Sequence, residues 1–253
     1  MIFDKMNYLN KNIPCLISVN IYEFDMKSGG FSILKKNNIF SESELKYINT
    51  LSKLDRNIYI GKLILKRPEL NDLLADGFKD AIMKFSQYNN IAEHNVISIK
   101  KDAIFIFDVL PRVLSFDGYT FQRKNTYSSY YYLNKLEIYY SSKSNLIDIK
   151  GISDANLIKH RNGILTFMLD LFRLAERKDK KKTLSIMKKY RSDYIGHKLN
   201  IEHYRQLDSS SLYKLKENIT GYDVMVEESN SIEEIDIGYN FHKIFIPLIS
   251  MYV

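Results

Sequence analysis

Cysteine is almost absent from this chain of 253 residues: only Cys15 is present, so no disulfide can form within the chain. The five histidines are scattered, and none stands at a spacing typical of a zinc site. These absences exclude a disulfide scaffold and a zinc-finger module. They favour a reducing compartment, and the cytoplasm is the natural expectation.

Proline and glycine are also few, at four and ten residues, so a loop-dominated chain is not expected. The 45% of hydrophobic residues, with 13% aromatics, can form one large core or two modest ones. No stretch approaches the roughly 20 apolar residues that a membrane-spanning helix needs, and the N-terminus lacks a signal-peptide layout. We therefore expect no membrane partner, and we expect the apolar tail 244–253 to be a core strand.

Acidic residues are outnumbered, which gives a formal net charge of +7. The excess is local, because residues 173–198 contain ten basic and three acidic residues. Clustered positive charge on one element is typical of a polyanion site, since phosphates are bound largely through counterion release. A solvated, lysine-rich helix face is the alternative explanation.

The first part of the chain alternates strands and helices. Residues 15–24 are rich in β-branched and aromatic side chains and predict a buried strand that delivers Asp25 at its end. After a break at residues 28–30 the chain reverses. A helix capped by Ser41 or Ser43 follows, and on it Lys46, Lys53, Arg56 and Asn57 would share one face.

A second helix is predicted over residues 69–88, and residues 95–107 predict a hairpin with Asp102 at the start of its second strand. Strands at 130–140 and 146–149 complete an α+β part. From about residue 153 helical periodicity dominates, with one helix around 157–174 and another at 183–199. We place a domain boundary near Gly151.

Two strand-end aspartates can share a site if their strands are neighbours. Asp25 and Asp102 would then be able to hold a pair of divalent ions, which is the arrangement used for in-line nucleotidyl transfer. Spacing alone is weak evidence, because aspartates at strand ends are common turn formers.

The flanking residues strengthen this interpretation. Residues 25–33 keep the aspartate, both serines and the isoleucine of a D-x-x-S-L-Y-P-S-I motif. Residues 53–61 keep the lysine, asparagine and glycine of K-x-x-x-N-S-x-Y-G, and residues 100–105 keep the second aspartate, isoleucine and phenylalanine of D-T-D-S-I-F. In this order the three segments resemble the motifs of family B DNA polymerases, over residues 15 to about 215 of this chain.

The resemblance implies a polymerase-like palm with an antiparallel sheet over residues 1–150, with minimal fingers at about 37–67, and a helical thumb with a C-terminal segment over 151–253. It implies that Asp25 and Asp102 are catalytic and bind two Mg²⁺ or Mn²⁺ ions. Substrate contacts would come from Lys53, Arg56, Asn57, Gly61, Ser28 and Gly30. Nucleic-acid contacts would come from Lys100, Lys101, Lys180, Lys181, Lys182, Lys188, Lys189 and Arg191.

The departures from the family pattern carry predictions of their own. Gly30 stands where the family has a tyrosine that excludes ribonucleotides, which implies relaxed sugar selectivity, as in a primase or an RNA-synthesising enzyme. Lys100 replaces the first aspartate of the third motif. No exonuclease segment is expected, so we do not expect this chain to proofread.

The expected partners are a template and primer, nucleoside triphosphates and other replication or transcription proteins, in a phage or mobile-element setting and hence a host cytoplasm. Two alternatives remain open: an inactive, polymerase-like protein that binds nucleic acid as a replication accessory, and an α+β scaffold whose motif matches are accidental.

Overall fold

The computed structural model describes residues 2–133, 136–152, 157–196, 198–204, 207 and 244–250. The chain divides into two compact units, the first made of residues 1–12 and 20–126 and the second of residues 13–19 and 127–253. Two long antiparallel strands, β2 (Cys15–Met26) and β6 (Tyr119–Leu133), contribute residues to both units. The α+β class is confirmed, whereas the palm, the thumb and the boundary near Gly151 stay predictions.

The sheet of the first unit is antiparallel and brings Asp25, on β2, close to Asp102. Asp102 was expected to start the second strand of the hairpin, but it lies in the turn one residue before that strand. Strands β3 (Val96–Lys100) and β4 (Ala103–Phe107) form the expected hairpin, and β4 pairs with β2 so that Asp25 lies opposite Ala103. The edge strand β1 (Asn7–Leu9) pairs with β3, and the short β5 (Ser115–Phe116) pairs with β6. The strand order across the whole sheet is β1-β3-β4-β2-β6-β7-β8.

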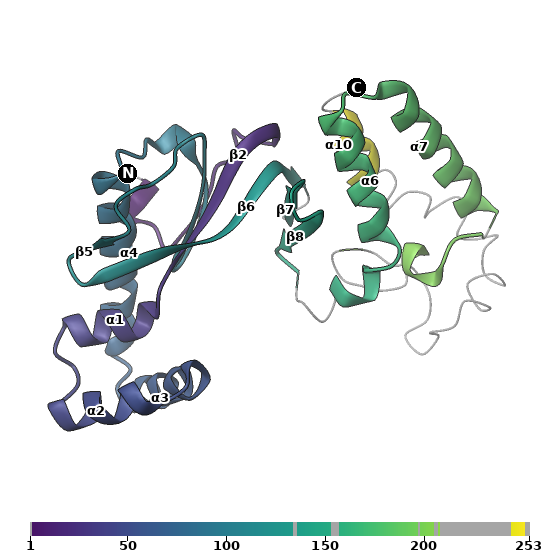
Figure 1. The fold of residues 1–253 in the computed structure, drawn as a ribbon. Helices are drawn as coiled ribbons and strands as arrows, with labels where there is room; N and C mark the ends of the chain where they lie inside the picture. Colours follow the sequence, from purple (N-terminus) through teal and green to yellow (C-terminus); the bar gives the residue numbers. More distant parts are fainter. Residues whose placement is uncertain are drawn as a thin grey trace. The chain divides into compact units, whose positions relative to one another are not determined.

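Four helices stand between β2 and β3 in the sequence of the first unit (Figure 1). They are α1 (Gly29–Lys36), α2 (Glu42–Thr50), α3 (Lys53–Lys66) and α4 (Leu70–Tyr88). Ser41 caps α2 in a capping box with Glu44, as the sequence predicted for one of its two candidate caps. The expectation of one helix running through Arg56 was wrong, because Leu51 is extended and Ser52 caps a new helix.

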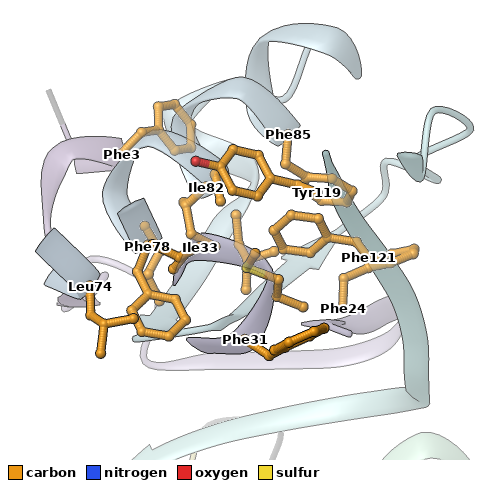
Figure 2. Close-up of a cluster of buried hydrophobic side chains, with 14 of the residues drawn as sticks. Phe3, Phe24, Phe31, Ile33, Leu74, Phe78, Ile82, Phe85, Tyr119 and Phe121 are labelled. Carbon is orange, nitrogen blue, oxygen red and sulfur yellow. The ribbon is translucent and has the colours of Figure 1, made fainter. Parts of the chain in front are cut away.

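The core of the first unit lies between the sheet and the helices α1 and α4, as Figure 2 shows. It contains Phe24 from β2, Phe31 and Ile33 from α1, and Phe78 and Phe85 from α4, all at most 9% exposed. A β-carbon on Gly77 would lie closer to the side chain of Ile33 than any real contact allows. Helices α1 and α4 therefore approach each other only because α4 carries a glycine at that position.

In its described residues, the second unit combines a short antiparallel meander with two long helices and a short C-terminal one. The end of β6 pairs with β7 (Leu136–Ser141), which pairs with β8 (Leu146–Lys150), so the single strand expected over 130–140 is divided between β6 and β7. The helices are α6 (Ile164–Glu176) and α7 (Lys180–Ile195), which begins three residues earlier than expected because Asp179 caps it.

The C-terminal tail is helical where it is described. The expected core strand over 244–253 was wrong, because α10 spans Ile246–Ser250 and its apolar side chains Leu248 and Ile249 are buried in the core of the second unit. Pro247 gives the physical reason. Proline cannot donate to a strand ladder, but it is well tolerated in the first turn of a helix.

Short 3₁₀ segments complete the described structure. They are Ile2–Asp4 and Glu93–Asn95 in the first unit, and Ile158–His160 and Ile201–Tyr204 in the second.

Candidate functional site

A cavity of about 300 Å³ opens in the first unit at the end of β2 where Asp25 lies. Its walls come from four segments that are far apart in the sequence: the end of β2 with the start of α1, the helix α3, the helix α4, and the turn between β3 and β4. The polar and glycine residues among its lining are Asp25, Ser28, Gly29, Gly30, Lys53, Asn57, Gly61, Lys101 and Asp102. Sequence reasoning had singled out all of these except Gly29 as site residues.

The two carboxylates are brought together by strand register. Asp25 lies on β2 opposite Ala103, the neighbour of Asp102, and the backbone N–H of Met26 donates to the carbonyl oxygen of Asp102 over 2.8 Å. Lys101 in the turn has a left-handed backbone with φ of 52°, which lets the hairpin reverse within two residues. Asp25 and Asp102 therefore occupy adjacent positions at one end of the sheet.

The environment of Asp25 disfavours its negative charge. Partial burial is the largest cause that raises the pKa of Asp25, and the nearby charge of Asp102 raises it further. The ammonium groups of Lys124 and Lys53 act in the opposite direction and lower it. The net effect is a raised pKa, as expected for a partly buried carboxylate beside a second one.

Glu23 is a third carboxylate of this region and was missed by the sequence analysis. It is only 2% exposed, it accepts a hydrogen bond from the Asn125 side chain, and it pairs with the Lys124 ammonium over 3.5 Å. Glu23 and Asp25 are two positions apart on one strand and therefore face the same side of the sheet. That alternation was visible in the sequence and would have indicated Glu23.

One stripe of α3 lines the cavity. Lys53, Asn57 and Gly61 follow one another at intervals of four residues, so their positions lie one above another on the helix. Lys53 is the first residue of α3, and the Ser52 side chain accepts the backbone N–H of Asp55 at the N-cap. The cap thus sets where α3 begins and which of its residues reach the cavity.

Arg56 does not line this cavity, and the expectation that Lys46 shares a helix face with Lys53 and Arg56 was wrong. The break between α2 and α3 places Lys46 on a different helix from Lys53. The Arg56 guanidinium instead stacks over the Phe31 ring, 5.1 Å from its centroid. This contact links α3 to α1, and the substrate contact expected of Arg56 stays a prediction.

Two glycines of the lining leave open space. A β-carbon on Gly30 would meet only Leu74, at an ordinary contact distance of 3.9 Å, and one on Gly61 would meet nothing within 4 Å. Neither glycine is required by close packing at its β-position. Gly29 is different, because its β-carbon would lie 2.7 Å from the Phe78 ring.

The two hairpin lysines differ in position. Lys101 lines the cavity, and its ammonium lies over the Phe78 ring, 5.1 Å from the centroid. Lys100, the last residue of β3, is not part of the cavity lining.

The basic residues of α7 lie in the second unit, on the solvent side of that helix. The buried positions of α7 are Thr183, Met187, Tyr190 and Tyr194, which form its core stripe. The exposed positions include all the basic residues singled out from the sequence, Lys180, Lys181, Lys182, Lys188, Lys189 and Arg191. Among these, the Lys189 ammonium pairs with Asp193 one turn later.

Within the described ranges no group of three or more His, Cys, Asp and Glu side chains is placed to hold a metal ion. No helix in the described part of the chain has the length and apolar character needed to cross a bilayer.

These features define an α+β protein with a cavity lined by carboxylates and lysines. The chain belongs to the family of the bacteriophage PBS1 gene 130 protein, whose model matches residues 1–250. The match indicates a phage origin. No curated protein matches the chain, and the resemblance to family B DNA polymerases stays a prediction.

Proposed function

We propose that this phage protein is a compact, template-dependent nucleic-acid polymerase that transfers nucleotides in the cavity of its first unit. The observation that carries the proposal is that residues from separate motifs meet in one cavity. Asp25, Lys53 with Asn57, and Asp102 come from three sequence segments and line one cavity. Accidental motif matches would not be expected to gather in this way.

The residues of the cavity fit the chemistry of a divalent cation. Carboxylate oxygens are the ligands that Mg²⁺ and Mn²⁺ prefer, and Mg²⁺ commonly needs only one or two of them beside water and phosphate oxygens. Asp25 and Asp102 would hold the cation, which supplies charge stabilisation at the reacting phosphate and activation of the attacking hydroxyl. The raised pKa of Asp25 is relieved when a cation binds, because the repulsion from Asp102 is then screened.

The lysine and asparagine of α3 have separate roles in this proposal. Lys53 faces the triphosphate and stabilises the negative charge that develops on the leaving group. Asn57 and Gly61 lie further along the same stripe, where a flat surface without a bulky side chain suits the nascent base pair. The absence of any atom within 4 Å of a β-carbon on Gly61 supports this role.

Gly30 supports relaxed selection between ribose and deoxyribose. Selection against a 2′-hydroxyl requires a side chain that occupies its space, and Gly30 has none. Since a β-carbon at Gly30 would meet only Leu74 at 3.9 Å, the cavity has room there. We infer that the enzyme accepts ribonucleotides, so its product includes RNA or a primer.

The basic face of α7 supports binding of a nucleic-acid backbone. Its exposed lysines and arginine would contact phosphates without reading sequence, and such binding should weaken steeply with salt. The partners that follow are a template and primer, nucleoside triphosphates and other phage replication or transcription proteins. The site of action that we propose is the host cytoplasm.

Primer extension tests the proposal. Wild-type protein with Mg²⁺ or Mn²⁺ should extend a primed template, and the isosteric variants Asp25→Asn and Asp102→Asn should each lose at least about 100-fold in rate. Asp108→Asn is the matched control, because Asp108 is an exposed carboxylate at the other end of β4 and its left-handed backbone tolerates asparagine. Wild-type protein that extends nothing with any template, primer or nucleotide would refute the proposal.

A second candidate function is a polymerase-like protein that binds nucleic acid without chemistry. Lys101 favours it, because a lysine in the cavity opposes binding of further cations. Under this alternative the wild-type protein binds primed template in a salt-sensitive way, the Asp25→Asn variant binds as well or better, and no nucleotide is incorporated by either.

A further inference from the structure

The charges that line the cavity cancel. Asp25 and Asp102 supply two negative charges, and Lys53 and Lys101 supply two positive ones. The neighbouring Glu23 and Lys124 form an ion pair and cancel as well. A pair of divalent ions about 3.5 to 4 Å apart would add four positive charges to a site that is already neutral.

A backbone hydrogen bond and a cation–π contact hold Lys101 at the cavity. Its backbone N–H donates to the carbonyl oxygen of Met6 over 2.7 Å, which fixes the turn, and its residue neighbour is Asp102. The ammonium lies over the ring of Phe78, itself a wall of the cavity. A cation over an aromatic face is stabilised by the negative quadrupole of the ring, so the side chain is kept in the site.

We propose that Lys101 is a resident cation that takes the place of one divalent ion, so that the cavity binds a single Mg²⁺ or Mn²⁺ instead of two. The inference rests on the proposed function, since it concerns the cation of that same site. Asp25 and Asp102 hold the one ion. The Lys101 ammonium supplies the second positive charge near the phosphates, but it cannot activate a hydroxyl, because it has no coordination position to offer.

The proposal separates the two lysines of the hairpin, and this gives a matched pair of variants. Lys101→Met and Lys100→Met remove the same charge from adjacent residues, but only Lys101 lines the cavity. Methionine keeps the length of the side chain, and at position 101 it meets the same left-handed backbone as lysine, so the turn is not newly strained.

The test measures Mn²⁺ binding to the full chain at low ionic strength. Calorimetry and the electron paramagnetic resonance signal of free Mn²⁺ report the binding. Wild-type protein should bind one ion, and Lys101→Met should bind one ion about fivefold more tightly, since one repelling charge is removed from an open and partly screened site. Lys100→Met should change the affinity less than twofold. Asp25→Asn should weaken Mn²⁺ binding in the wild type and in both lysine variants.

A charge reversal extends the test. Lys101→Asp places a third carboxylate at the turn, on a backbone conformation that aspartate tolerates, and should convert the cavity to a site for two ions. Crystals grown with Mn²⁺ and an α,β-methylene nucleoside triphosphate should show one manganese peak at the aspartates in the wild type and two in Lys101→Asp.

Two manganese peaks in the wild type, equal affinities of Lys101→Met and wild type, or no Mn²⁺ binding at all would each overturn the inference. These outcomes are separable from failure of the proposed function. A protein that binds one Mn²⁺ with the expected dependence on Lys101 but extends no primer loses the polymerase assignment and keeps the resident cation. A protein that extends primers with two bound ions keeps the polymerase assignment and loses the resident cation.

Discussion

The contact between Gly77 and Ile33 offers a sharp test of how the first unit holds its helices. The substitution Gly77→Ala adds a β-carbon that would lie within 3.0 Å of three side-chain carbons of Ile33. Ile33 is 0% exposed and cannot move into solvent. Overpacking of this kind typically costs 1 to 3 kcal/mol, whereas alanine in place of glycine in a helix gains at most about 1 kcal/mol.

The overlap should therefore win, and Gly77→Ala should destabilise the protein by about 1 to 2 kcal/mol. For a chain of this length such a change lowers Tm by roughly 2 to 8 °C. Gly61→Ala is the matched control, because Gly61 is also helical but its β-carbon would meet nothing within 4 Å. It should leave stability unchanged or raise it by up to about 1 kcal/mol.

Urea unfolding of the single and double variants measures both the cost and its cause. The cavity left by Ile33→Ala is costly by itself, but it also makes room for the new methyl group. The double variant Ile33→Ala/Gly77→Ala should therefore be more stable than the sum of the two single effects, by about 1 kcal/mol or more. If Gly77→Ala is as stable as the wild type, or if the two effects simply add, close packing of α1 on α4 is not the reason for the glycine.

Three further predictions follow from caps and buried charges. Ser41→Ala should destabilise the protein by about 1 kcal/mol in urea unfolding, whereas Ser43→Ala, within the same helical turn, should cost less than half of that, because only Ser41 caps α2. Asp25→Asn should stabilise the protein at pH 7 but not below about pH 3.9, as urea unfolding at the two pH values would measure. The folded state raises the pKa of Asp25, so the wild type loses stability as the pH rises through that raised value. Asparagine does not ionise and escapes this loss. Burial lowers the pKa of His203 to about 4, so the unfolded chain binds the proton more readily than the folded one. Wild-type stability should therefore fall as the pH is lowered from about 6.5 to about 4. If Tm of a His203→Gln variant depends on pH in this range as steeply as Tm of the wild type, this assignment is contradicted.

The strand that ends near Asp25 and the hairpin before Asp102 were predictable from the sequence because each is a local feature. A strand that ends near Asp25 and a hairpin that turns at Lys101 are both readable from alternation and turn position. Once β4 pairs with β2, Asp25 and Asp102 become neighbours. The raised pKa of Asp25 depends on that pairing and was not accessible from the sequence.

The α3 side was harder to predict, because a helix pattern can continue across a real break. Leu45, Ile48 and Leu51 fit the same period as Leu54, and nothing in that period shows that Leu51 is extended. Ser52 is the deciding residue, since its side chain caps the next helix and so changes which residues share a face. The tail failed for a different reason: its apolar content suggested a strand, and the weight of Pro247 against a strand was missed.

The two sides of the cavity are held by different forces, which bears on how it would work. Asp25 and Asp102 are fixed by strand pairing over a core in which Phe24, Ile104 and Phe105 are at most 1% exposed. In α3, by contrast, Ile60 is the one buried residue of the helix, while Leu54 and Leu65 are well exposed. Because Tyr59, Leu63 and Ile64 are only partly buried, we expect α3 to open or shift at lower cost than the strands. Under the proposed function, the carboxylates that would hold the cation sit on the rigid side of the cavity and Lys53 sits on the more adjustable side. That division would suit a site that accepts different nucleotides in turn.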